Sequence, residues 1–146
     1  MIDGGVYTVA VPLGRSVAGF ILGLFLGILG GWLAVIFNAM ADYPWPLSIH
    51  RIIYLMGIGL GAGVGAYLAW LNLGIRRALI IGSVLLVLTG GISGAYLGYV
   101  YGQSVDPTYL GRSYTVDNWI HLGAAIGAIA ASTTLGLIGV IRSPDR

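Results

Sequence analysis

Each of the four apolar stretches of this chain carries glycine or alanine at every fourth position. Residues four apart lie on one face of an α-helix, so each stretch would present a stripe that has no side chains. In water such helices would be poor, because an interior glycine costs about 1 kcal/mol relative to alanine. In lipid the backbone must bond within its own helix, and a bare stripe lets a neighbouring backbone approach closely. We therefore predict that a set of glycines packs the helices together: Gly19, Gly23, Gly27, Gly31, Gly57, Gly61, Gly65, Gly90, Gly94, Gly98, Gly123 and Gly127.

The stripes also predict which substitutions disturb the packing. Leucine in place of Gly27 or Gly61 should push two helices apart, because close backbone contact depends on the missing side chain. Leucine at Ile28 or Ile58, which lie off the stripes, is expected to change little.

The composition favours a membrane protein as well. Hydrophobic residues make up 58% of the chain and charged residues 8%, whereas soluble domains carry about 25% charged residues. Four segments exceed the roughly 20 residues that cross a bilayer and contain neither charge nor proline: residues 16–40, 52–73, 78–101 and 119–141. We predict an all-α integral membrane protein with four transmembrane helices, forming a single transmembrane domain over residues 1–146. Residues 1–15 lack the pattern of a signal peptide, so we expect them in the mature protein.

The chain resembles a duplicated, glycine-rich helical hairpin. Residues 30–42 match residues 94–106 at a shift of 64, where small residues, aromatic residues and a final aspartate coincide. In the second helix of each half, Gly57 aligns with Gly123 and Gly61 with Gly127, at a shift of 66. We expect hairpins over residues 16–73 and 78–141, related by an axis along the membrane normal. Chance similarity between glycine-rich segments is the alternative.

The alternating glycines of residues 57–65 are similar to the glycine-rich helix of the proteolipid rotor subunits of vacuolar-type ATPases. That family carries a carboxylate in the middle of a helix, where it holds the transported ion. All five aspartates of this chain lie outside the predicted spans or at their ends. The resemblance therefore implies a similar architecture without the ion-carrying site.

His50 and His121 are the only imidazoles, and both lie near the same predicted end of their helices. Two histidines at similar depth could ligate one haem, or each could ligate a chlorin magnesium. The commoner alternative is an interfacial histidine that bonds to a carbonyl or a lipid headgroup. His121 lies deeper and is the better candidate. We expect no other metal or cofactor, apart from lipids or a quinone against an apolar face.

The other polar residues fit structural roles. Asp42 and Asp106 begin turn-type sequences, and Asp117 with Asn118 predicts an N-cap for the fourth helix. Hydroxyl groups within the third and fourth spans are expected to bond to carbonyls of their own helix or across a helix interface. These residues are Ser83, Thr89, Ser93, Ser132, Thr133 and Thr134.

No catalytic set is recognisable in the sequence. Cysteine is absent, which excludes thiol chemistry, and the glycine runs lie inside spans rather than in phosphate-binding loops. A net charge of +2, spread along the chain, is no nucleic-acid footprint. We expect a protein that is not an enzyme, with the lipid bilayer and other integral membrane subunits as partners.

Two functions from different classes remain. The first is a non-catalytic accessory subunit of a larger membrane complex, respiratory or photosynthetic for example. Its glycine stripes would pack against partner helices, lipid, quinone or pigment, and some stripes would stay free for those partners. The second is a small homo-oligomeric channel or carrier for a neutral or small solute. Against it, no charged residue lies within the spans, where transport pathways usually place one.

The arginines predict the orientation in the membrane. Five of the seven lie on the side of the termini and of residues 72–77, and only Arg51 and Arg112 lie on the other. Cytoplasmic loops carry the excess of basic residues, so we predict a multi-pass protein of the inner or cytoplasmic membrane with both termini cytoplasmic. The two outward loops would hold interfacial aromatic residues, namely Tyr43, Trp45, Tyr109, Tyr114 and Trp119.

This orientation is testable by labelling, because the absence of natural cysteine makes every introduced thiol unique. Single cysteines at Ser48 and Ser113 should react with a membrane-impermeant thiol reagent added outside intact cells. A cysteine at Ser143 should react only after the membrane is opened. The reverse labelling pattern would contradict the assignment.

Overall fold

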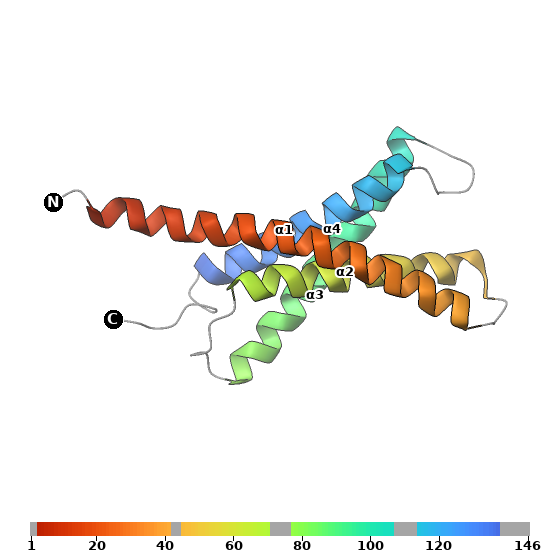
Figure 1. Ribbon diagram of the computed structural model, residues 1–146, viewed down its shortest axis with the longest axis horizontal. Coiled ribbons are helices and arrows are strands. Elements are labelled where there is room, and N and C mark those ends of the chain that lie inside the picture. Colours follow the sequence, from red (N-terminus) through yellow and green to blue (C-terminus); the bar gives the residue numbers. More distant parts are fainter. Residues whose placement is uncertain (1–2, 42–44, 71–76, 107–113, 138–146) are drawn as a thin grey trace.

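The computed structural model of the chain describes residues 3–41, 45–70, 77–106 and 114–137, and these form four α-helices (Figure 1). The helices are α1 (Asp3–Met40), α2 (Leu47–Trp70), α3 (Arg77–Val105) and α4 (Tyr114–Leu137). All four are long and apolar enough to cross a membrane. The prediction of an all-α membrane protein with four transmembrane helices is confirmed.

Three helices begin several residues before the predicted spans, namely α1, α2 and α4. Helix α1 begins at Asp3 and continues through Pro12, whereas the predicted span begins at residue 16. Helix α4 begins at Tyr114, so the prediction of Asp117 as an N-cap is wrong. Asp117 lies in the first turn of that helix. The helix dipole favours a carboxylate in the first turn as well as at the N-cap, so Asp117 still lies at a favourable position.

The helices form two hairpins, α1–α2 and α3–α4, which cross near the middle of the bundle (Figure 1). Helices α2 and α4 each pack against all three of the other helices. Within the described residues, α1 and α3 do not touch. We call the end where α1 begins and α4 ends the terminal end, and the opposite end the turn end.

Glycines of neighbouring helices face each other directly within each hairpin. A Cβ atom added to Gly57 would lie 2.5 Å from the carbonyl oxygen of Gly30, and one added to Gly30 would overlap the carbonyl of Gly57. In the second hairpin Gly94 and Gly123 oppose each other in the same reciprocal way. Since no side chain fits between them, each pair brings two helix backbones into contact.

The two hairpins repeat these contacts at matching positions. The Gly30–Gly57 pair corresponds to the Gly94–Gly123 pair at shifts of 64 and 66. Beside the first pair lies the Cβ of Ala34, 2.7 Å from the added Cβ of Gly57. In the second hairpin the backbone of Gly98, also shifted by 64, lies 3.0 Å from the added Cβ of Gly123. The sequence match is therefore also a match of packing partners.

Helix α2 carries a second glycine face that the predicted stripes do not include. A Cβ atom on Gly59 would lie 2.5 Å from the Cα of Ile92, and one on Gly63 would lie 2.9 Å from the Cα of Leu88. Gly59 and Gly63 are offset by two residues from Gly61, which places them on the opposite side of the helix. Helix α2 is thus bare on both sides, toward α1 and toward α3.

The expectation that a substitution at Ile58 changes little is wrong, because this residue is part of the packed core. Its side chain is 0% exposed and reaches the positions where Cβ atoms of Gly27 and Gly31 would stand. It fills the space between two stripe glycines, so a change there disturbs the core. Ile28, by contrast, is 45% exposed.

Polar contacts between the hairpins are found at the terminal end. The hydroxyls of Ser16 and Thr133 lie 3.0 Å apart and link α1 to α4, and those of Tyr67 and Ser83 lie 3.3 Å apart and link α2 to α3. Interhelical bonds of this kind contribute about 0.6 kcal/mol each in a membrane. They join the hairpins to each other near the chain termini.

A matched pair of substitutions in α3 tests the backbone contacts. Alanine at Gly94 would place a Cβ 2.9 Å from the carbonyl carbon of Gly123, and overpacking of this kind costs roughly 1–3 kcal/mol. The melting temperature of the detergent-solubilised protein should fall by several degrees. Alanine at Gly82, which has nothing within 4 Å, should leave it unchanged or raise it. Equal melting temperatures for the two variants would contradict the packing role of Gly94.

Candidate functional site

His121 is held within its own helix. Its Nδ1 atom lies 2.7 Å from the carbonyl oxygen of Asp117, one turn earlier in α4. Because a carbonyl oxygen only accepts, Nδ1 is the donor, and Nε2 of a neutral ring keeps its lone pair. Metal-ligating histidines usually have this arrangement, but so do structural ones. The geometry is compatible with ligation at Nε2 and does not require it.

An aromatic ring from α2 packs against this imidazole. Tyr54 stands edge-on to His121, with ring centroids 6.5 Å apart and planes at 81°. Both side chains are half-buried. The contact joins the two hairpins at the turn end.

His50 has different surroundings. Its ring lies 6.2 Å from that of Trp45, which in turn lies 6.3 Å from Phe37 at the end of α1. Its backbone carbonyl accepts a hydrogen bond of 3.4 Å from Nδ2 of Asn38. Each histidine therefore has its own aromatic neighbour, from a different element. Ligation of haem or chlorin by either residue stays a prediction, and the described residues contain no cluster of three metal-ligating side chains.

Five of the six hydroxyl groups follow the sequence expectation, and the sixth, Ser93, lines the apolar groove described below. Four of them donate to carbonyls three or four residues earlier in their own helix at distances of 2.7–3.1 Å: Ser83, Thr89, Ser132 and Thr134. Thr133 instead bonds across the interface to Ser16. These side chains serve helix bonding and interhelical contacts rather than lining an open passage with free hydroxyls.

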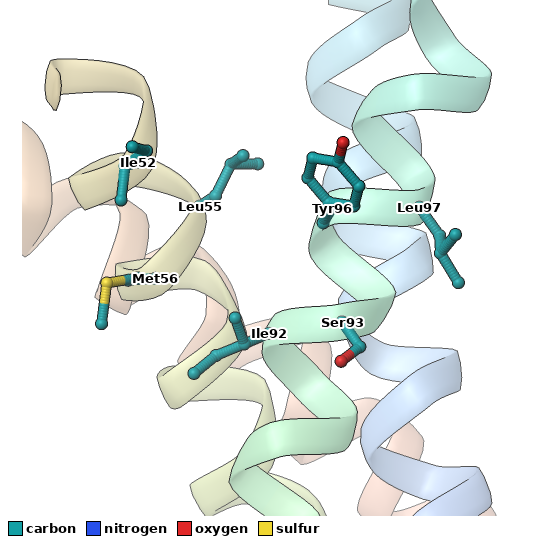
Figure 2. A pocket seen from close by; sticks show the side chains of 7 residues that line it. All are labelled: Ile52, Leu55, Met56, Ile92, Ser93, Tyr96 and Leu97. Carbon is teal, nitrogen blue, oxygen red and sulfur yellow. The ribbon is translucent and has the colours of Figure 1, made fainter. Parts of the chain in front are cut away.

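Near the turn end the hairpins diverge, and a groove opens between α2 and α3 (Figure 2). We call it the hairpin groove. It has a volume of about 420 Å³ and is almost entirely apolar. Its lining residues are Ile52, Leu55 and Met56 from α2, with Ile92, Ser93, Tyr96 and Leu97 from α3. In Figure 2 Leu55 and Tyr96 point toward each other across it.

A second groove, of about 370 Å³, runs between α3 and α4. We call it the glycine groove, because four glycines contribute to it: Gly94, Gly98, Gly123 and Gly127. Larger side chains complete the lining, namely Leu97, Tyr101, Trp119, Leu122 and Ile126. Tyr101 and Trp119 meet edge to face at a centroid distance of 4.6 Å. The glycines that bring α3 and α4 together therefore also line a surface groove.

The structure places every predicted stripe glycine against another helix of the same chain. Gly19, Gly23, Gly27 and Gly31 face α2, and Gly57, Gly61 and Gly65 face α1. Gly90, Gly94 and Gly98 face α4, and Gly123 and Gly127 face α3. The expectation that whole stripes stay free for partners is wrong, because the two hairpins pair their stripes internally. Only the open side of the glycine groove remains.

Neither groove was recognised in the sequence. Both depend on how the helices diverge, and no local pattern specifies that. The available signal was the placement of bulky residues such as Tyr96 and Leu97 beside glycines, which indicates an uneven surface. Tyr43 and Tyr109, predicted as interfacial, lie outside the described residues.

Comparisons with protein families, with curated proteins and with solved structures found no match to this chain. Its function therefore has to be argued from the geometry above.

Substitution of His121 tests the ligation hypothesis. The imidazole already has a carbonyl and a tyrosine ring as neighbours, so we expect alanine at this position to leave the absorption spectrum of the purified protein unchanged. A loss of stability of about 1 kcal/mol is expected from the missing hydrogen bond. Alanine at His50 serves as the comparison. Disappearance of a haem or chlorin band from the His121 variant alone would establish a ligand role.

Proposed function

We propose that this chain is a non-catalytic accessory subunit that packs against other integral membrane subunits of a larger complex. The observation that carries the proposal is the glycine groove between α3 and α4. Helices do not associate in lipid through the hydrophobic effect, so partners must fit closely in shape. A groove with four glycines in its lining allows such a fit, because these positions add no side chain between the larger residues that flank them.

The flanks of the groove support the same proposal. Tyr101 and Trp119 stand at its turn end, and Ile126 lies further along α4 with 52% of its surface exposed. Aromatic side chains provide large and rigid contact areas in protein interfaces. The proposal assigns no chemical step to the chain; its role is to hold a neighbour in place.

The matching contacts of the two hairpins support a duplicated origin. Gly30 with Gly57 and Gly94 with Gly123 are the same contact at the shifts found in the sequence. We infer that one ancestral hairpin specified both halves. Ala34 stands where the second half has Gly98, so only the α3–α4 hairpin has a glycine at this position.

Blocking the glycine groove tests the proposed function. Tryptophan at Ile126 would fill the groove from an exposed position without entering the contact between α3 and α4. Tryptophan at Leu85, which is also exposed but lies outside both grooves, is the matched control. From native membranes, the tagged wild-type chain and the Leu85 variant should co-purify the same subunits in fixed stoichiometry. With the Ile126 variant, the amount of co-purified subunits should fall at least tenfold.

Other results would contradict the proposal. Equal recovery of partner subunits with both tryptophan variants would exclude the groove as the docking surface. A stable homo-oligomer that lacks other subunits and conducts a neutral solute in liposomes would favour the channel or carrier hypothesis instead.

A further inference from the structure

The hairpin groove is closed at its narrow end by backbone contact. At that end Gly59 meets Ile92 so closely that an added Cβ would lie 2.5 Å from its Cα. From there the two helices separate toward the turn end (Figure 2). The groove is therefore a wedge whose floor is the crossing of α2 and α3.

An arginine stands at the wide end of this wedge. The guanidinium carbon of Arg51 lies 5.0 Å from the ring centroid of Tyr99, so the contact joins α2 to α3. Arg51 is one turn before Leu55, and Tyr99 is one turn after Tyr96, and both Leu55 and Tyr96 line the groove. Arg51 and Gly59 are eight residues apart, which corresponds to about 12 Å of helix.

The groove opens toward the surroundings of the bundle. Ile52 and Leu97 on its two sides are 55% and 65% exposed, and both lie within membrane-spanning segments. The hydrocarbon region of a bilayer supplies no water to fill such a space. An apolar wedge there is filled by hydrocarbon chains.

The charge of Arg51 indicates which kind of lipid provides the hydrocarbon chain in the groove. Within the described part of the protein, its guanidinium lies against a tyrosine ring and no carboxylate. A guanidinium near the end of a membrane span binds phosphate oxygens through charge-assisted hydrogen bonds. The ring of Tyr99 holds the cation in place by a cation–π contact. A neutral quinone supplies no anion to this guanidinium.

We propose that the hairpin groove is a binding site for an anionic phospholipid, with one acyl chain between α2 and α3 and the phosphate on Arg51. The site is independent of the proposed function, because the glycine groove lies between α3 and α4 and shares only Leu97 with it. The bound lipid fills the space between the hairpins where they diverge.

The test uses the purified full-length chain in detergent, with phosphatidylglycerol or phosphatidylcholine of identical acyl chains added. Native mass spectrometry counts the lipids bound to each chain. One phosphatidylglycerol should bind about fivefold more tightly than phosphatidylcholine, the effect expected from one basic residue near an anionic headgroup. Arg51→Gln should abolish this preference. Arg15→Gln is the matched control, since Arg15 also lies over an aromatic ring, that of Trp70, but at the terminal end.

A second pair of variants tests the acyl chain. Ser93→Trp would fill the groove from an exposed position, whereas Thr89→Trp places the same bulk one turn away, outside it. Ser93→Trp should reduce the binding of both lipids at least fivefold, and Thr89→Trp should not. Thermal melting of each variant shows that it is folded. Arg51→Lys, which keeps the charge, should retain the preference for phosphatidylglycerol, and Arg51→Met replaces the glutamine variant if that does not fold.

Three results would overturn the proposal. The first is equal binding of the two lipids by the wild-type chain. The second is an undiminished preference for phosphatidylglycerol in Arg51→Gln. The third is displacement of the bound lipid by an equimolar isoprenoid quinone, which would make a quinone the occupant of the groove.

Discussion

Direct contact between helix backbones at opposed glycines is the interaction on which this structure depends. Inside lipid, apolar side chains gain nothing by leaving one hydrocarbon for another, so helices associate through close packing. Gly30 and Gly57 present their Cα atoms to each other's carbonyls, as do Gly94 and Gly123. A Cα–H group that faces a carbonyl oxygen of a neighbouring helix can donate a weak hydrogen bond to it. Each hairpin has one such contact, at equivalent positions in the two halves, and this contact holds its two helices together.

The joining of the two units follows from the alternation of glycine in α2. Gly57 and Gly61 face α1, whereas Gly59 and Gly63 face α3, so one helix is approached closely from both sides. The hairpins touch at this crossing and diverge beyond it (Figure 1). The hairpin groove is the geometric result of a close crossing followed by divergence. Its position near the turn end is therefore set by where Gly59 and Gly63 stand in α2.

The sequence was sufficient for the number of helices, their membrane character and the glycines that pair them. It was insufficient where two helices had to be placed relative to each other. The four-residue spacing of the stripes does not include Gly59 and Gly63, and it places Ile58 off the stripes although its side chain is enclosed. The contact between Arg51 and Tyr99 joins residues 48 positions apart. Spacing along the chain contains no information on such a pair before the hairpins are docked.

The opposed glycines have a consequence for how the fold responds to temperature. The heat capacity change of unfolding in water arises mainly from hydration of newly exposed apolar surface. When two helices separate within a bilayer, the surfaces around Gly94 and Gly123 exchange one hydrocarbon environment for another and are not hydrated. The heat capacity change of this step is accordingly small. Its free energy then varies almost linearly with temperature, without the curved maximum that hydration of apolar surface gives the stability of soluble proteins.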